Sequence, residues 1–166
     1  MQTMAASEDI RVNYVRSLGM INDQIDPAMD DIVKNLSDIT QCPIAMISLV
    51  ESQRVWFKAA VGINVRQVRR SISFCSDAIA STSGIEILDA SCHPRYRSNP
   101  LVTGITSLRF YSGIPVAPHH GHPVGALCVL DTNVRAPLTP RQKRQMKSLG
   151  RNLAALISSR MTGSLG

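Results

Sequence analysis

The chain has 166 residues, 44% of them hydrophobic, and its 18 basic and 12 acidic residues give a net charge of +6. This length suits one domain with a full core rather than two. No apolar run approaches the roughly 20 residues that span a bilayer. The start, M-Q-T-M-A-A-S-E-D-I, lacks the basic and apolar regions of a secretory signal. We therefore expect a cytoplasmic protein with no membrane partner.

The positive charge is concentrated near the C-terminus. Residues 139–161 hold six of the 18 basic residues and no acid, so the rest of the chain has 12 basic residues against 12 acidic ones. A nucleic-acid-binding groove usually spreads its charges and interleaves aromatic side chains. This segment has no aromatic residue, which argues against a nucleic-acid partner.

The cysteine and histidine residues do not form a recognisable metal site or disulfide framework. Cys42, Cys75, Cys92 and Cys128 contain no C-x-x-C pair. The H-H-G-H run at 119–122 has the side chains for a transition metal, but on a hairpin turn other polar residues would serve equally well. We expect no metal and leave the cofactor unknown.

Two helices are predicted before the first strand. The first is predicted at residues 8–21, where one face carries an apolar stripe of Ile10, Tyr14, Leu18 and Ile21. This stripe has to be covered, and a second copy of the chain would supply the cover. Gly19 is the expected stop of this helix. Asp26 and Pro27 start the next helix, because Asp accepts early backbone N–H bonds and Pro suits the first helical position.

The middle of the chain reads as strands separated by one short helix and loops. The predicted strands are 44–50, 55–61, 85–88, 108–116 and 124–130, with a loop at 63–70, a short helix at 73–80 capped by Ser73, and irregular chain at 93–100. The first two strands are joined so tightly that they must be antiparallel neighbours. Trp56 and Phe57 should point to opposite faces.

The last helix begins at a capping box formed by Thr139 and Gln142. Its buried stripe is Met146, Leu149, Leu153, Leu156 and Ile157. Gly150 interrupts the helix at a cost of about 1 kcal/mol, which a close helix–helix approach would explain. Strands grouped between helices indicate an α+β fold with an antiparallel sheet. The acidic segment 26–38 should face the basic last helix across one face of that sheet.

Five phrases, in this order, carry a family resemblance. They are I-S-L-V-E-S-Q-R-V-W-F-K at 47–58, S-F-C-S-D-A-I at 73–79, P-R-Y-R-S-N-P-L-V-T-G at 94–104, R-F-Y-S-G-I-P-V at 109–116 and H-P-V-G-A-L-C-V-L-D at 122–131. With these phrases the chain resembles the GAF domain family, the small-molecule sensor modules of bacterial signalling proteins. It is most similar to the branch found beside histidine kinases and diguanylate cyclases, and R-S-L-G-M-I-N-D-Q-I-D-P at 16–27 looks like the lead-in of that branch.

The resemblance implies an antiparallel sheet of about six strands with the N- and C-terminal helices on one face. It implies a pocket on the other face, under the short helix and the loops of residues 62–107. It also implies a homodimer formed by the terminal helices and a kinase or cyclase effector. The expected division is a lead-in helix at 1–24, a GAF-like domain at 25–161 and a disordered tail at 162–166.

The candidate ligand-binding residues lie in the segments between the strands. They are Phe74, Cys75, Asp77, Asp89, Arg95, Tyr96, Arg109 and Tyr111. Arg109 begins an otherwise apolar strand and could fork onto a ligand carboxylate or phosphate, or form an internal salt bridge to Asp89 or Asp77.

The remaining candidates also have two interpretations. Arg95, Tyr96 and Asn99 either contact ligand or cap the pocket's loop. Cys75 is either a small buried residue or a thiolate stabilised near a helix start. No residue is assigned to catalysis.

The sequence thus favours a non-catalytic sensor domain that signals through the terminal helices of a dimer. One alternative is a thiol-dependent methionine sulfoxide reductase, as some GAF-fold proteins are, although the cysteines do not match that group's pattern. Another is a tetrapyrrole photosensor, but Cys75 precedes Ser76 and Cys128 precedes Val129, so the expected Cys-His or Cys-Leu attachment pair is absent.

Overall fold

The computed structural model describes residues 2–118 and 121–165. A single antiparallel sheet has the strand order β3-β2-β1-β6-β5-β4. The strands are β1 (Ile44–Val50), β2 (Arg54–Val61), β3 (Gln67–Arg69), β4 (Ile85–Ile87), β5 (Phe110–Val116) and β6 (Gly125–Asp131). This α+β arrangement with six strands confirms the predicted fold class.

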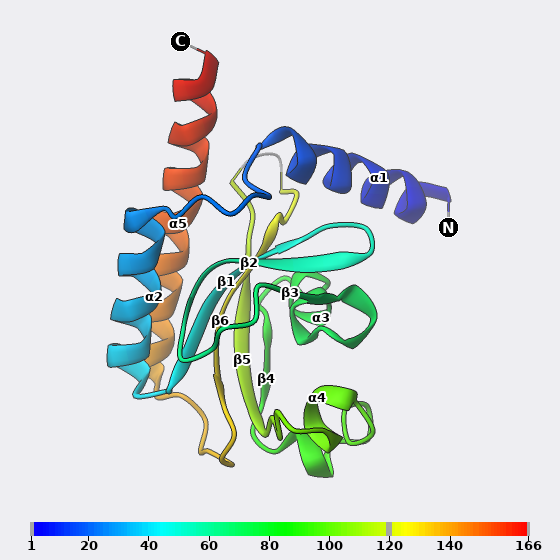
Figure 1. The fold of residues 1–166 in the computed structure, drawn as a ribbon, viewed down its shortest axis with the longest axis vertical. Helices are drawn as coiled ribbons and strands as arrows, with labels where there is room; N and C mark the ends of the chain where they lie inside the picture. The colour runs from blue at the N-terminus through cyan, green and yellow to red at the C-terminus, as the bar shows by residue number, and fades with distance from the viewer. Residues whose placement is uncertain (1, 119–120, 166) are drawn as a thin grey trace.

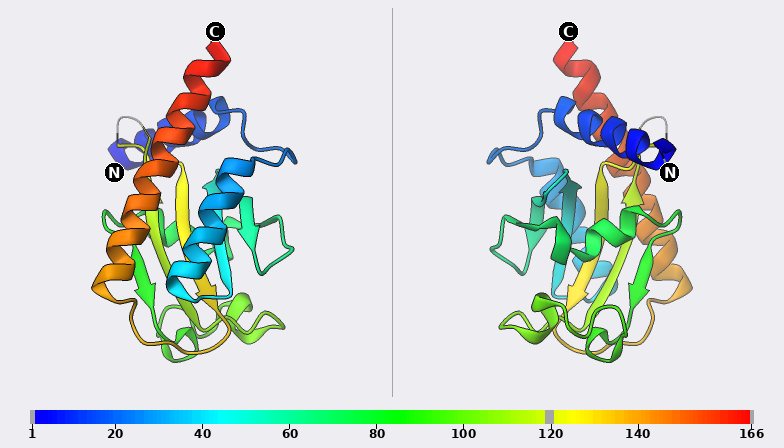
Figure 2. Two further views of the ribbon diagram at one scale, coloured as in Figure 1. Left: turned by 90° about the vertical axis from the view of Figure 1, so that its left-hand side faces the viewer. Right: turned by 90° about the vertical axis from the view of Figure 1, so that its right-hand side faces the viewer.

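Helices cover both faces of the sheet (Figure 1). They are α1 (Gln2–Ser17), α2 (Pro27–Thr40), α3 (Phe74–Ile79), α4 (Pro100–Thr103) and α5 (Pro140–Leu165), with short 3₁₀ turns η1 (Arg70–Ile72) and η2 (Ala90–Cys92). The long helices α2 and α5 pack side by side on one face, and α3 and α4 lie on the other (Figure 2). The helix α1 crosses one end of the sheet, at the same end as the final turns of α5.

The two central strands are buried on both faces. Every residue of β1 and of β6 is buried, which explains why their sequences are apolar almost throughout. There are two polar exceptions. The Ser48 hydroxyl accepts a hydrogen bond from the backbone N–H of Ala126 at 3.1 Å, and the Asp131 carboxylate at the end of β6 pairs with Arg135 at 2.8 Å. Trp56 packs against the core under α2 and α5, and Phe57 against the core under α3, so they face opposite sides as predicted.

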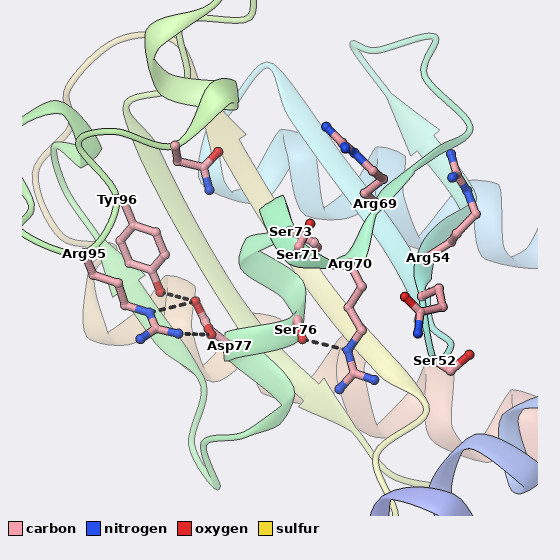
Figure 3. A pocket seen from close by; sticks show the side chains of 12 residues that line it. Ser52, Arg54, Arg69, Arg70, Ser71, Ser73, Ser76, Asp77, Arg95 and Tyr96 are labelled. Carbon is pink, nitrogen blue, oxygen red and sulfur yellow. Dashed lines mark hydrogen bonds and ion pairs between the residues drawn. The ribbon is translucent and has the colours of Figure 1, made fainter.

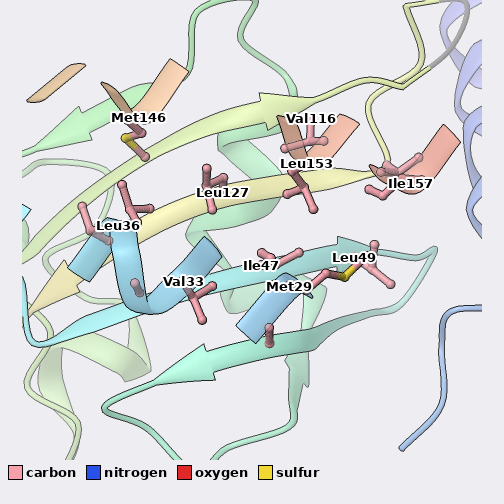
Figure 4. Close-up of a cluster of buried hydrophobic side chains, with 14 of the residues drawn as sticks. Met29, Val33, Leu36, Ile47, Leu49, Val116, Leu127, Met146, Leu153 and Ile157 are labelled. Atoms are coloured by element: carbon pink, nitrogen blue, oxygen red, sulfur yellow. The ribbon is translucent and has the colours of Figure 1, made fainter. Parts of the chain in front are cut away.

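The helices α2 and α5 bury apolar faces against the sheet, and the buried face of α5 belongs to its predicted stripe (Figure 4). The fully buried members are Met29, Val33, Leu36, Met146, Leu153 and Ile157, which pack with Ile47, Leu49 and Leu127 of the strands. The predicted starts of both helices are also confirmed. The Asp26 carboxylate accepts from two backbone N–H groups of α2, and Thr139 and Gln142 form the reciprocal capping box of α5. Asp26 further pairs with Arg160 of α5 at 3.1 Å.

The first helix differs from its prediction. It ends at Ser17, and Gly19 follows in a left-handed conformation (φ 65°). Its buried residues include Val12 and Val15, whereas Ile10, a member of the predicted stripe, is 54% exposed. The reason is tertiary: the buried Arg11 guanidinium donates to the carbonyl of Val50 at 2.7 Å and to that of Pro123 at 3.2 Å, which turns this face of α1 toward the strand ends.

Three smaller features also differ. The strand β3 lies within the predicted loop 63–70, where three residues pair with the start of β2. Gly150 faces Ile114 of β5, because a Cβ added there would lie 2.9 Å from the Ile114 Cδ1 atom; the close approach is helix to strand rather than helix to helix. The helix α5 continues to Leu165, through residues that the sequence assigned to a tail.

None of the helices in the described part of the chain has both the length and the apolar character of a membrane span.

The turn after β2 should require glycine at position 62, and a comparison of Gly62→Ala with Gly19→Ala tests this. Gly62 and Gly19 both have positive φ, but a Cβ on Gly62 would lie 2.1 Å from the Pro43 carbonyl oxygen, whereas nothing lies within 4 Å of one on Gly19. Gly19→Ala should lower the free energy of unfolding by about 1 kcal/mol, from backbone strain alone. Gly62→Ala should lower it by about 2 kcal/mol more. Chemical denaturation measures both free energies of unfolding. Equal losses for the two substitutions would contradict the close approach of Gly62 to Pro43.

Candidate functional site

A polar hollow of about 750 Å³ opens on the side of α3 that faces away from the sheet (Figure 3). It lies between the start of β2, the β3–η1 segment, the helix α3 and the loop before α4. Arginine, serine and a few other polar side chains line it: Ser52, Gln53, Arg54, Arg69, Arg70, Ser71, Ser73, Ser76, Asp77, Arg95, Tyr96 and Asn99.

The short helix α3 separates this hollow from the core. Its predicted cap is confirmed, because the Ser73 hydroxyl oxygen accepts a hydrogen bond from the backbone N–H of Cys75 at 3.1 Å. This start directs Phe74 and Cys75 inward, where both are buried, and leaves Ser76 and Asp77 on the hollow side. One helical turn therefore supplies both core residues and pocket residues.

Asp77 holds the loop before α4 onto α3. Its carboxylate accepts from the Arg95 guanidinium at 2.8 Å and from the Tyr96 hydroxyl at 2.7 Å. The Tyr96 ring stacks on Phe74, with 4.3 Å between ring centroids. Burial, followed by the hydrogen bond to Asp77, raises the pKa of Tyr96 to about 12.

Asn99 also fixes this loop. Its side-chain amide donates to the carbonyl of Ile72 at 3.1 Å, and its side-chain oxygen accepts from the backbone N–H of Leu101. In the structure, the family phrase at 94–104 therefore has the loop-capping role that the sequence offered as one interpretation. Three of its members, Arg95, Tyr96 and Asn99, also line the hollow.

The other aromatic and thiol candidates form a packed layer beneath α3. Tyr111 and Cys75 are 1% and 2% exposed. The Tyr111 hydroxyl donates to the Cys75 sulfur at 3.2 Å, and the sulfurs of Cys75 and Cys128 are 3.8 Å apart. The hydrogen bond to Cys128 contributes most to lowering the pKa of Cys75 to about 7, while burial raises the pKa of Cys128 well above its ordinary value. Phe74, Cys75 and Tyr111 do not line the hollow.

Arg109 and Asp89 lie outside the hollow as well. The Arg109 guanidinium donates to the backbone carbonyls of Val102 and Leu108, at 3.1 and 3.0 Å. Asp89 accepts from Ser91 and Cys92, and the Ser91 hydroxyl contributes most to lowering its pKa, with a smaller effect from the Arg109 charge. Asp77, the other partner proposed for Arg109, pairs with Arg95 instead.

Three arginines of the hollow were not recognised as site residues from the sequence. Arg54 begins β2, Arg69 ends β3 and Arg70 begins η1. For Arg69 and Arg70 the sequence does carry a signal, the basic cluster at 66–70 directly before the phrase at 73–79. Without periodicity in that loop, its side chains could not be assigned to a face.

Arg70 connects the hollow to α1. Its Nε donates to the Ser76 hydroxyl at 2.9 Å, while its Nη1 donates to the carbonyl oxygen of Glu51 at 3.0 Å and pairs with the Glu8 carboxylate of α1. Glu8 also pairs with Arg11 at 2.9 Å. Hydrogen bonds from Arg11, and then from Arg70, lower the pKa of Glu8 to about 2.

The structure brings no metal-binding group together in its described part, where no cluster of three or more His, Cys, Asp or Glu side chains occurs. Two members of the H-H-G-H run, His119 and His120, lie outside the described residues.

The Glu8 ion pairs predict a specific acid dependence. A carboxyl group with a folded pKa near 2 and an ordinary value of 4.5 stabilises the folded state above about pH 4.5, and this stabilisation is lost as the pH falls toward 2. The stability advantage of the wild type over Glu8→Gln should therefore shrink from pH 5 to about pH 3. Urea unfolding at several pH values measures it, and an advantage that does not change with pH would contradict the ion pairs.

The surroundings of the three tyrosines predict that their hydroxyl groups ionise only at unusually high pH. Burial raises the pKa of Tyr14 and Tyr111 as well as that of Tyr96, so in the folded protein none should ionise at the ordinary value of 10. Absorbance at the phenolate band measures this, and Asp77→Asn should lower the pKa of Tyr96 by removing the carboxylate charge that opposes its ionisation. One tyrosine's amplitude titrating near pH 10 in the native wild type would contradict the geometry.

The chain is similar to known proteins in both sequence and structure. A GAF domain family model matches residues 24–157. A cyclic di-GMP phosphodiesterase of Pseudomonas aeruginosa is 38% identical over 150 residues, which are 90% of this chain but only 26% of that protein. The chain therefore spans about a quarter of the length of this relative.

Two solved structures share the fold at low sequence identity. The GAF domain of a phosphoenolpyruvate-protein phosphotransferase from Coxiella burnetii superimposes with a TM-score of 0.65 at 16% identity, covering 97% of this chain and 96% of that one. The chromophore-binding domain of an unusual bacteriophytochrome from R. palustris gives a TM-score of 0.69 at 10% identity, covering 98% and 62%. With the family match across most of its length, the chain belongs to the GAF domain family.

Proposed function

We propose that this chain is a non-catalytic sensor domain of a bacterial signalling protein, which binds a small molecule in the hollow beside α3. The observation that carries the proposal is the hollow itself: about 750 Å³, lined almost wholly by polar side chains, beside α3 on the side away from the sheet. The volume lies in the range of small-molecule sites, and the hydrogen-bonding side chains of the lining suit a polar ligand. Asp77, Arg95 and Tyr96 are the predicted site residues that lie there, and they are proposed ligand contacts.

The proposed effector is an enzyme of cyclic di-GMP turnover. The similar protein from Pseudomonas aeruginosa is a cyclic di-GMP phosphodiesterase, and this chain matches only 26% of its length, which leaves most of that protein for other functions. A domain of this kind would regulate such an enzyme, or a cyclase or kinase, from a position beside it. The expected setting is the bacterial cytoplasm.

Signals would leave the domain through its terminal helices in a homodimer. The final turns of α5 extend beyond the sheet at the end where α1 crosses it, and Ile10 of α1 is 54% exposed, so an apolar side chain is available there for a second copy. A ligand can change the helix arrangement only if it binds one arrangement better than the other. Sensing therefore requires a contact between the hollow and a terminal helix.

Neither chemical alternative gains support from the site. Cys75 and Cys128 are buried beneath α3 and do not line the hollow, which argues against a thiol reductase working there. The similarity to a bacteriophytochrome shows the fold alone at 10% identity.

A nucleic-acid partner for the basic helix α5 gains no support either. Its basic side chains include Arg160, which pairs with Asp26, and Lys143, which pairs with Glu86, so part of that charge is neutralised within the domain.

Native mass spectrometry of the purified protein tests both parts of the proposal. We expect two copies of the chain and a non-covalent excess mass in the small-molecule range. Ser71→Trp, which places a large ring in the hollow, should abolish the excess mass, whereas Ser98→Trp, at an exposed position that does not line the hollow, should retain it. A bare monomer, or a bound molecule unaffected by Ser71→Trp, would refute the corresponding part.

A further inference from the structure

The charges of the hollow are strongly unbalanced. Arg54, Arg69, Arg70 and Arg95 line it together with a single acid, Asp77. Asp77 pairs with Arg95 at 2.8 Å, which leaves three guanidinium groups without a carboxylate inside the hollow. The Arg69 side chain makes no ion pair with any residue that the structure describes. The hollow therefore favours a ligand that carries negative charge.

The other lining groups suit an oxyanion. Serine hydroxyls from three segments face the hollow, at Ser52, Ser71 and Ser76. Hydroxyl and guanidinium groups together are the donors that proteins use for phosphate, because a guanidinium can bind two oxygens at once. The volume of about 750 Å³ exceeds that of inorganic phosphate alone, so the phosphate would belong to a larger organic molecule.

Arg70 is the group that could respond to such a ligand. Its Nε is already directed to Ser76 in the hollow, at 2.9 Å, while its Nη1 pairs with Glu8 of α1 (Figure 3 shows the first of these contacts). The side chain is 22% exposed, so its outer end can move. A phosphate in the hollow and the Glu8 carboxylate would compete for the same guanidinium.

Glu8 can lose Arg70 without being left as an unpaired charge. Its two oxygens also accept from Arg11, at 2.9 and 3.0 Å, and Arg11 is buried and fixed to the strand ends. Two guanidinium groups thus share one carboxylate in the ligand-free protein. Releasing Arg70 toward a ligand costs less than breaking an isolated buried pair would.

We propose that the hollow binds an organic phosphate and that Arg70 couples its binding to α1 by exchanging the Glu8 carboxylate for the ligand phosphate. The inference rests on the proposed sensor function and names its ligand class and its coupling residue. Because coupling is reciprocal, removing the Glu8 contact must strengthen ligand binding by as much as ligand binding weakens the Glu8 contact.

The ligand class is tested with matched pairs of probes. Binding of glucose 6-phosphate and of guanosine 5′-monophosphate is measured by calorimetry at constant ionic strength, beside glucose and guanosine, with inorganic phosphate as a fifth probe. We expect the phosphorylated member of at least one pair to bind and its parent not to. Arg70→Ala and Arg69→Ala should each raise the Kd about tenfold. Equal binding of phosphorylated and parent compounds would overturn the phosphate assignment.

The coupling is tested by substitutions on α1, which does not line the hollow. Glu8→Gln should lower the Kd about threefold, as expected for one partly exposed ion pair. Asp9→Asn is the matched control, because it removes the same charge from the next residue, which is exposed and forms no ion pair with Arg70 or Arg11 among the described contacts. It should leave the Kd unchanged.

A double-mutant cycle assigns the effect to Arg70. Glu8→Gln should still tighten binding in the Arg69→Ala protein but not in the Arg70→Ala protein. An equal effect in both backgrounds, or an equal effect of Asp9→Asn, would overturn the coupling role of Arg70. Two controls separate these effects from misfolding. Arg70→Lys keeps the positive charge at this position, and the melting temperature of each variant shows whether it is folded. If mass spectrometry finds a bound uncharged molecule instead, the ligand class fails while the sensor function stands.

Discussion

Every residue of β1 and β6 is buried, so the sheet must be covered on both of its faces. The rest of the structure depends on this constraint. The helices α2 and α5 cover one face with aliphatic side chains, and a layer containing Phe74, Tyr111 and Cys75 covers the other. Because that second layer is tightly packed, the hollow lies on the outer side of α3, where polar side chains can face solvent and ligand together.

This position places the hollow near the end of the sheet that α1 crosses. Arg70, at the boundary, contacts the hollow through Ser76 and α1 through Glu8. A ligand there needs no large rearrangement of the core to affect α1, since only one arginine side chain has to change its partner. Such a short connection suits a sensor, because the ligand must distinguish two arrangements of a terminal helix.

The sequence predicted the parts of this fold that depend on local chemistry. The capping residues Asp26 and Thr139 and the apolar run of β1 occur where the pattern placed them. The buried face of α1 could not be predicted, because it is set by hydrogen bonds from Arg11 to carbonyl groups that are 39 and 112 residues away in sequence. The strand β3 is too short and polar to produce a recognisable period.

The candidate site was only partly predictable, in its location and in its residues. The resemblance implied a pocket under α3, but that layer is filled by buried side chains such as Phe74 and Tyr111, and the hollow lies on the outer side of the helix. The segment 73–79 and the loop of Tyr96 do border the hollow. Whether an aromatic residue such as Tyr111 lines a cavity or fills it depends on packing between distant segments, and Tyr111 fills it. Arg54 and Arg70 line the same hollow only because β3, which leads into η1, pairs with the start of β2, and no sequence period records this pairing.

Amide hydrogen exchange of α1, measured with and without a saturating organic phosphate, tests the central claim most directly. If the ligand draws Arg70 away from Glu8, exchange in residues 8–17 should accelerate on binding while exchange in β1 and β6 stays unchanged or slows. If α1 exchanges at the same rate or more slowly when the hollow is filled, the hollow and the helix are not coupled in this way.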